Sequence, residues 1–261
     1  MKFKTSDQIE LDYDDVGTGQ PVLIMTGYAG YREIWRAQVE TLVSHGYRVI
    51  NLDRRNHGRS ETTTKGLRMS RQGKDVAELL DYLDLDHVDV MGNSMGAATI
   101  WAYCSLYGDR RLHKVISVDQ YPKMISDETW SDGLLDLTWA NFPTEASAMI
   151  RVHTTFKRID DETYRAVKDV QAGKTFDYQL NQPLLYDHAF QDWRDVIRQL
   201  SVPVLFMAGA ESPFWNPEHA QKSAALCPKG QFWIAPEAGH IIMAEQQAAF
   251  NDQMLTFLAD E

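Results

Sequence analysis

Residues 88–98, with the sequence VDVMGNSMGAA, constrain the possible fold more than any other stretch of this chain. They combine a short apolar strand, the pattern G-x-S-x-G and the start of a helix, a setting in which the serine hydroxyl stands on a strained turn above a sheet. Gly92 and Gly96 lack the Cβ atoms that would collide with neighbouring backbone at such a turn. Free amides and the positive end of the helix dipole favour negative charge beside Ser94. The sequence therefore predicts that Ser94 is a nucleophile rather than an ordinary helix cap.

Apolar runs alternate with amphipathic segments along most of the chain. Residues 1–19 indicate an N-terminal hairpin, with a turn at residues 17–19. Helical spacing of apolar residues separates the later strands, and this β-α-β-α series predicts an α/β fold with a mostly parallel sheet and right-handed crossovers. Besides the strand at residues 88–92, we expect buried strands at residues 21–26, 47–52, 115–118, 203–208 and 231–234.

The alternation stops near Pro122. From there the sequence is rich in aromatic residues and helix-like, without a clear buried strand, until the pattern resumes near residue 203. We therefore expect a core domain made of residues 1–122 and 196–261, interrupted by a helical insertion at residues 123–195.

Charge and composition narrow the class of protein. The chain has 261 residues, of which 44% are hydrophobic, and this is enough to bury a sizeable core. Its net charge of −11 argues against nucleic acid or an anionic membrane surface as a partner. The N-terminal residues are polar, and no run reaches the length of a membrane span, so we expect a soluble cytoplasmic protein. The two cysteines, Cys104 and Cys227, could form one disulfide but are more typical of buried free thiols.

His240 is the leading candidate for the base that activates Ser94. It follows the last predicted strand, and the carboxyl ends of parallel strands share the edge where α/β folds place their sites. We expect the other histidines to be surface or loop residues: His45, His57, His87, His113, His153, His188 and His219.

An acyl-transfer reaction also needs donors for the oxyanion. The backbone amide of Met95, directly after the nucleophile, is one candidate. The second is expected from the glycine-rich loop after the strand at residues 21–26, where Tyr28 is the predicted contributor.

Together these segments resemble the α/β-hydrolase superfamily over nearly the whole chain. The resemblance rests on Thr26-Gly27-Tyr28, on the turn from Asp53 to Ser60, on the G-x-S-x-G elbow and on Ala238-Gly239-His240. It implies that residues 123–195 form the cap domain that covers the pocket and selects substrates in that family. Thr26 and Asn56 replace a frequent histidine and a glycine of the family's pattern, and neither change removes a catalytic group.

A third departure concerns the acid that completes the triad. The family commonly carries it after the strand corresponding to residues 203–208, where this chain has Ser212. Glu211 is one residue early and could turn inward. Asp119 follows the strand after the elbow helix, a place where some lactonases and one group of dehalogenases of the superfamily are similar in carrying their acid. We favour Asp119, keep Glu211 as the alternative, and leave open that neither serves.

The predicted activity is cofactor-free hydrolysis of a carboxylic ester or lactone of a small, largely apolar substrate. No metal-ligand or phosphate-loop pattern is present in the sequence, so no cofactor and no metal are expected. The elbow is also similar to that of carbon–carbon bond hydrolases, although His240 lacks their following tryptophan. A ligand receptor or sensor of the same fold with slow turnover is the alternative from another class. We expect a monomer or a homodimer.

Overall fold

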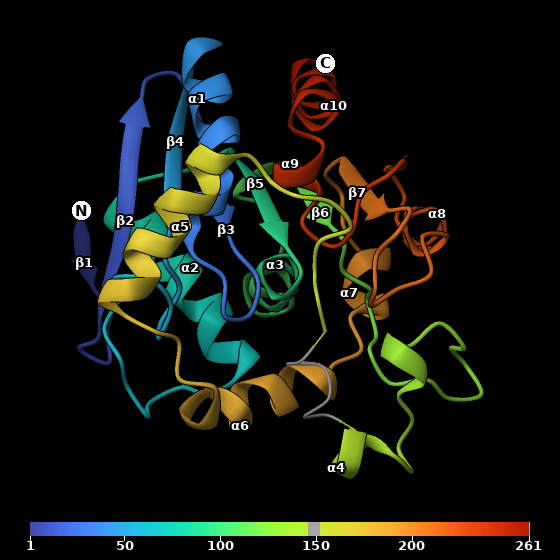
Figure 1. Cartoon of the computed structure of the whole chain (residues 1–261). Helices are drawn as coiled ribbons and strands as arrows, with labels where there is room; N and C mark the ends of the chain where they lie inside the picture. The colour runs from blue at the N-terminus through green and yellow to red at the C-terminus, as the bar shows by residue number, and fades with distance from the viewer. Residues whose placement is uncertain (146–151, 261) are drawn as a thin grey trace.

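The structure of the protein is a computed structural model that describes residues 1–145 and 152–260 (Figure 1). The strands are β1 (Lys2–Lys4), β2 (Glu10–Gly17), β3 (Gln20–Met25), β4 (Tyr47–Leu52), β5 (Val88–Asn93), β6 (Leu112–Val118), β7 (Val204–Gly209) and β8 (Gly230–Ala235). They form one eight-stranded sheet in the order β1-β2-β4-β3-β5-β6-β7-β8. The pairs β1–β2 and β2–β4 are antiparallel, and all other neighbours are parallel. The predicted α/β class is confirmed. An N-terminal hairpin is present as β1 and β2, but its turn lies between Lys4 and Glu10, and the turn expected at residues 17–19 instead leads from β2 to β3, which do not pair.

Helices surround this sheet and fill the long connection between β6 and β7. The 3₁₀ helices are η1 (Arg32–Trp35) and η2 (Leu134–Asp136). The α-helices are α1 (Arg36–Ser44), α2 (Met69–Tyr82), α3 (Met95–Tyr107), α4 (Phe142–Glu145), α5 (Asp161–Gly173), α6 (Tyr178–Ala189), α7 (Arg194–Arg198), α8 (His219–Leu226), α9 (Ile242–Glu245) and α10 (Gln247–Ala259).

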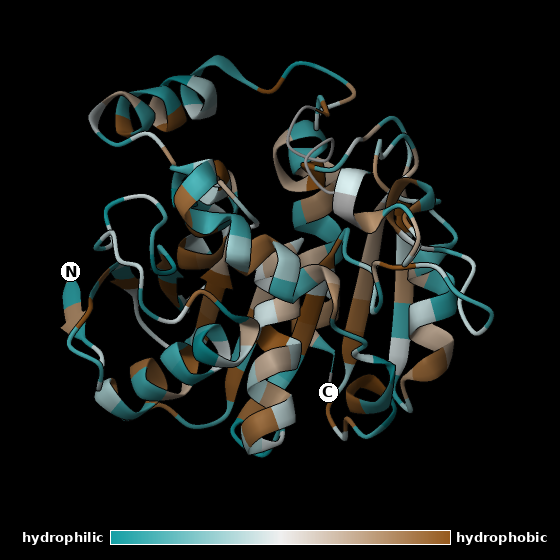
Figure 2. Cartoon of the chain, turned by 90° about the horizontal axis from the view of Figure 1, so that it is seen from below, coloured by the Kyte–Doolittle hydropathy of each residue, from teal (hydrophilic) through white to brown (hydrophobic). Residues whose placement is uncertain are grey.

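Two hydrophobic layers, one on each face of the sheet, hold the molecule together. One face packs against α2, α3, α7 and α8, and the other packs against α1, α9 and α10. The central strands are buried on both sides, which explains why they read as continuous apolar runs instead of alternating patterns. Figure 2 shows the hydrophobic strands in the middle and hydrophilic helix surfaces around them.

The inserted region lies at the carboxyl edge of the parallel strands. In Figure 1 the arrow of β5 points toward α6, whereas the arrow of β2 points the opposite way. Leu184 and Leu185 of α6 belong to the same buried cluster as strand residues Leu23 and Val90, so this helix packs directly on the core. Within the described ranges, the region between β6 and α7 contains helices and isolated bridges but no strand, as the sequence predicts.

Two further expectations can be compared with the structure. Cys104 and Cys227 are both free and buried, in agreement with the interpretation as buried thiols. Among the residues described, no helix is long and apolar enough to cross a membrane.

Candidate active site

Ser94 occupies the turn between β5 and α3 in a strained conformation. Its φ of 54° and ψ of −127° lie in a region that residues with a side chain rarely adopt. A Cβ atom at Gly92 would lie 2.4 Å from the amide nitrogen of Ala97, and one at Gly96 would lie 2.4 Å from the carbonyl oxygen of Met25. The two glycines therefore allow the close approach of backbone that this turn requires.

His240 and Asp119 meet at the same edge of the sheet. Nδ1 of His240 lies 2.5 Å from Oδ2 of Asp119, and both side chains are buried. A carboxylate only accepts hydrogen bonds, so Nδ1 carries the proton and Nε2 of the neutral ring is left as an acceptor. His240 and Ser94 line the same cavity.

The carboxylate of Asp119 receives three hydrogen bonds besides that of His240. Ser212 Oγ donates to Oδ2 at 2.7 Å, and Oδ1 accepts from the amide of Gly209 at 3.1 Å and from Nε2 of His219 at 3.3 Å. Burial opposes ionisation of Asp119, but the hydrogen bonds from the two histidines outweigh it and hold the pKa of Asp119 well below its usual range. The carboxylate is therefore ionised at neutral pH.

The structure brings Asp119, and not Glu211, to His240. Glu211 is exposed, and its backbone amide donates to the carbonyl of Ala238. Ser212, which stands where the acid is common in the resembling family, points its hydroxyl at the carboxylate of Asp119. The side chain of Asp119, which follows β6, therefore lies in the same space that the side chain of Ser212, which follows β7, also reaches.

The loop after β3 lies against the nucleophile. A Cβ atom at Gly27 would lie 2.9 Å from Cβ of Ser94, so the loop and the elbow are in close contact. Within the part of the chain that the structure describes, the amides of Tyr28 and Met95 donate no hydrogen bond to the protein. Both residues line the cavity, and these two amides are therefore free to donate to a ligand.

Two buried side chains of the turn after β4 hold this loop in place. Arg54 donates to the carbonyls of Thr26 and Gly27, each at 3.0 Å, and burial lowers the pKa of Arg54 to about 9. Nε2 of His57 accepts from the amide of Ala29 at 3.2 Å, while its Nδ1 faces a backbone carbonyl. Burial lowers the pKa of His57 well below its ordinary value, so the ring is neutral. Sequence reasoning missed both supports.

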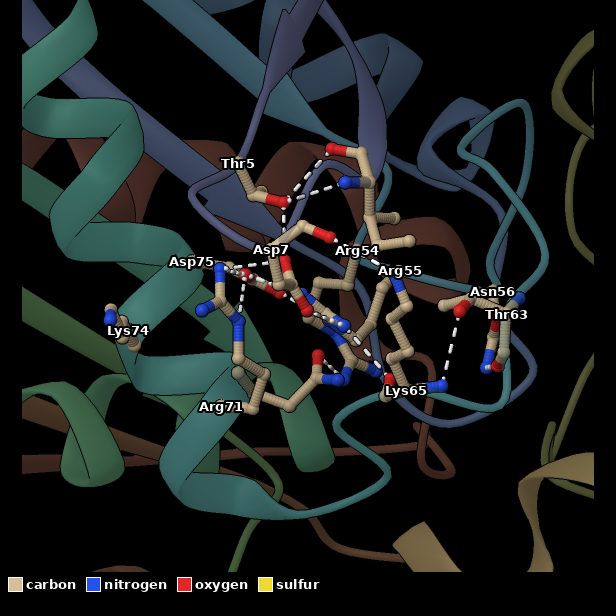
Figure 3. A network of polar contacts seen from close by, with 12 residues as sticks. Thr5, Asp7, Arg54, Arg55, Asn56, Thr63, Lys65, Arg71, Lys74 and Asp75 are labelled. Atoms are coloured by element: carbon tan, nitrogen blue, oxygen red, sulfur yellow. Dashed lines mark hydrogen bonds and ion pairs between the residues drawn. The ribbon is translucent and has the colours of Figure 1, made fainter.

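The neighbouring Arg55 points away from the loop and anchors the same turn to α2. Its Nε lies 2.6 Å from Oδ2 of Asp75, and its guanidinium also contacts Asp7 (Figure 3). Arg71 of α2 contacts the same two carboxylates. The turn after β4 is therefore fixed by an ion-pair network on one side and supports the loop after β3 on the other.

Two histidines contradict the expectation that all but His240 lie at the surface or in loops. His188 and His219 are buried on helices, whereas His57 lies in a loop, as expected, although it is buried too. His57 packs under the loop after β3, His188 lies on α6, and His219 packs on the ring of Tyr121 and against Asp119. Their neighbours come from distant parts of the chain, so the polar residues next to them in sequence carried no signal of burial. The expectation holds for the exposed His45, His87 and His153 and the half-buried His113.

The cavity above Ser94 has a volume of about 400 Å³. Its lining is largely apolar, with side chains from both the core and the inserted region, among them Ile34, Met124, Leu134, Val167, Phe214 and Trp215. A cavity of this size and character suits a small organic molecule. Among the described residues, no group of three or more histidine, cysteine, aspartate or glutamate side chains could hold a metal ion.

Comparison with known proteins gives one family match. The family described as the alpha/beta hydrolase fold matches residues 20–247. A non-heme chloroperoxidase from Streptomyces lividans is 36% identical, with the alignment covering 97% of this chain and 98% of the relative. A putative non-heme chloroperoxidase from Synechocystis is 27% identical over 98% of this chain and 97% of its own length.

Solved structures agree with this match. An esterase from Exiguobacterium antarcticum has a TM-score of 0.88 at 18% identity, covering 100% of this chain and 99% of that chain. A bromoperoxidase from Bacillus anthracis has a TM-score of 0.82 at 27% identity, covering 97% of this chain and 96% of that chain. The first likeness is evidence for the fold alone.

Proposed function

Because the chain belongs to the α/β-hydrolase family, we propose that it is a serine hydrolase that cleaves a carboxylic ester or lactone of a small, largely apolar substrate. The observation that carries this proposal is the 2.5 Å contact between His240 Nδ1 and Asp119, beside a cavity that Ser94 also lines. A nucleophile, a base and a group that orients the base are the parts that this chemistry needs.

In the proposed mechanism, Oγ of Ser94 attacks the carbonyl carbon while Nε2 of His240 takes the hydroxyl proton. The amides of Tyr28 and Met95 donate to the resulting oxyanion. His240 then gives its proton to the leaving alkoxide, and the alcohol departs from the acyl-enzyme. Water, deprotonated by His240, attacks the acyl carbon and releases the acid and free Ser94. Asp119 holds the imidazole and stabilises the imidazolium at both stages.

We also propose that residues 123–195 are a cap that covers the pocket. Met124, Leu134, Val167 and Leu185 come from this range and contribute to the cavity lining. The apolar character of these side chains favours an acyl or aromatic group in the bound substrate.

The test is steady-state hydrolysis of p-nitrophenyl esters of short and medium acyl chains and of lactones. Ser94→Ala is expected to abolish turnover, and Asp119→Asn to lower kcat by about 10⁴, because the imidazole loses its orienting carboxylate. Glu211→Gln is the matched control and is expected to keep wild-type kcat. If Glu211→Gln is the inactive variant, our assignment of the acid is wrong. If no ester or lactone is turned over rapidly, the hydrolase proposal fails.

The relatives named non-heme chloroperoxidases favour a second candidate activity at the same site. Ser94 would condense with a carboxylic acid such as acetic acid, releasing water, and hydrogen peroxide would then attack the acyl-enzyme and release a peracid and free Ser94. The peracid oxidises bromide to hypobromite, the brominating agent, and is itself reduced to the carboxylic acid. The assay mixes enzyme, acetate, hydrogen peroxide and bromide and follows bromination of an indicator dye. Bromination that requires Ser94 supports this activity, and bromination equal in Ser94→Ala contradicts it.

Turnover assays also distinguish the two remaining alternatives, the carbon–carbon bond hydrolase and the slow-turnover receptor. A vinylogous diketone that is cleaved while esters are not would favour the carbon–carbon hydrolase. Turnover limited to a single round, with a partner protein bound, would favour the receptor.

A further inference from the structure

A buried histidine outside the proposed triad lines the cavity. His188 lies on α6, is 4% exposed, and its Nδ1 has no hydrogen-bond partner among the described residues. A buried polar atom without a partner costs free energy, so it calls for an explanation in function or in packing. Burial, aided by the positive charge of Arg54, lowers the pKa of His188 to about 3, so the ring is neutral at physiological pH.

Two more polar side chains of the cavity are in the same situation. The hydroxyl of Tyr28 and Oε1 of Gln120 are buried without a partner among the described residues. Nε2 of Gln120 donates to the carbonyl of Tyr121 at 2.7 Å, which fixes the orientation of the amide and leaves Oε1 as a free acceptor. Burial raises the pKa of Tyr28, so its hydroxyl stays protonated and can donate.

These groups suit an uncharged polar partner. Among the residues that the structure describes, no aspartate or glutamate lines the cavity, and Lys168 of the lining is exposed to solvent. A hydroxyl group both donates and accepts, so it can satisfy an acceptor such as Gln120 Oε1 and a donor such as the Tyr28 hydroxyl. The neutral ring of His188 can take either part, according to its tautomer.

We propose that the substrate carries a hydroxyl group in addition to the scissile carbonyl, and that His188, with Tyr28 and Gln120, binds this hydroxyl. The inference rests on the proposed hydrolase function and adds a substrate class to it, the hydroxylated esters. His188 is in this view a residue that determines specificity and takes no part in the proton transfers of the triad.

The experiment compares kcat/KM for methyl hexanoate with kcat/KM for its 3-hydroxy and 6-hydroxy derivatives. For the wild type, we expect at least one hydroxylated ester to be preferred by about tenfold or more, since a site built to bind a hydroxyl discriminates against analogues that lack it. His188→Phe is expected to bring that ratio close to one, and His188→Asn, which keeps a hydrogen-bonding group, to retain part of it.

Two further variants guard against a trivial loss of folding. Tyr28→Phe removes only a hydroxyl and leaves the backbone amide in place, and it is expected to lower the same ratio. Tyr186→Phe removes a hydroxyl from α6 outside the cavity and is expected to leave the ratio unchanged. Circular dichroism checks that each variant is folded.

The possible failures are distinguishable. If the wild type hydrolyses methyl hexanoate in a Ser94-dependent way but prefers no hydroxylated ester, the inference is wrong and the hydrolase proposal stands. If a preference exists and survives in both His188→Phe and Tyr28→Phe, the hydroxyl is bound elsewhere and the inference is equally wrong. If no ester is hydrolysed at all, the hydrolase proposal and this inference fail together.

Discussion

Asp119 shows how one side chain can replace another in the same space. Its carboxylate accepts from His240, and Ser212, after the next strand, donates to the same oxygen at 2.7 Å. A carboxylate placed on residue 212 would therefore start from a backbone position that already reaches this part of the site.

This geometry predicts that a carboxylate at residue 212, after β7, can partly replace the carboxylate of Asp119, after β6. Asp119→Asn removes the charge that stabilises the imidazolium of His240, and adding Ser212→Asp returns a carboxylate to the same surroundings. We expect the double variant to regain at least about tenfold of the kcat/KM lost in Asp119→Asn, measured with p-nitrophenyl butanoate. Asp119→Asn with Ser212→Asn, which adds no charge, is the control. Equal activity of the two double variants would contradict the prediction.

His188 gives stability a pH dependence whose sign can be worked out. Its pKa is lowered by burial to about 3 in the folded protein, and an unfolded histidine titrates near 6.5. Between these two pH values, His188 is protonated in the unfolded chain but not in the folded protein. The free energy of unfolding is therefore unaffected by this group above about pH 6.5, and it falls by about 1.4 kcal/mol per pH unit below that value.

Removing this imidazole is therefore expected to flatten the dependence. From about pH 7 to about pH 5, the free energy of unfolding of His188→Phe should fall less steeply than that of the wild type, as measured by urea denaturation. His45→Phe, at an exposed position directly after α1, is the control and should follow the wild type. Parallel curves for wild type and His188→Phe would show that the ring does not remain neutral in the folded state.

At the scale of whole elements, α9 joins the loop of the base to the inserted region. The carboxylate of Glu245 accepts hydrogen bonds from the amides of Gly239 and Ile241 on either side of His240, and from the amides of Phe156 and Lys157. One buried side chain thus fixes the backbone of two segments that are far apart in the sequence.

Glu245→Ala leaves these buried amides without acceptors. We expect the free energy of unfolding to fall by about 2–4 kcal/mol, given a cost of about 1–3 kcal/mol for each buried group left unsatisfied and partial access of water to the gap. We also expect kcat to fall, because the loop that carries His240 loosens. Urea denaturation and ester hydrolysis measure the two effects. Glu128→Ala, at an exposed position, should change neither, and a Glu245→Ala protein as stable as the wild type would contradict this role.

The elements themselves were predictable because their signals are local. The strand at residues 47–52 has the expected bounds, the strand expected at 203–208 lies at Val204–Gly209, and the elbow at Ser94 is marked by its two glycines. The roles of Glu245 and Arg54 were not predictable, because their partners are backbone atoms of distant segments. Every residue carries these backbone atoms, so no sequence pattern indicates which of them a side chain contacts.

The proximity of Asp119 to His240 was predictable only in part. Both were expected at the carboxyl edge of a parallel sheet, since each follows a strand. The choice of Asp119 over Glu211 depended on a resemblance, because Glu211 also follows a strand and the difference between them is the direction in which each side chain points.

For the whole molecule, the decisive feature is that the inserted region has two kinds of apolar contact. Leu184 and Trp193 belong to the same buried cluster as Leu23 and Val90, whereas residues 124–142 of the region form a smaller buried cluster of their own with Tyr121 and Trp215. An inserted region with only its own core could unfold separately, whereas one whose helix also completes the core of the sheet cannot leave without exposing that core.

This arrangement predicts a single cooperative unfolding transition that is sensitive to a substitution in α6. Leu184 is fully buried, so Leu184→Ala should cost about 2–5 kcal/mol. Because α6 and the sheet unfold together, circular dichroism and tryptophan fluorescence should report the same, lowered midpoint in Leu184→Ala. Leu106→Ala, at a residue of α3 that is 49% exposed, should leave the midpoint near that of the wild type. Two separated transitions would mean instead that residues 123–195 unfold as an independent unit, and that the proposed cap can open while the proposed triad stays assembled.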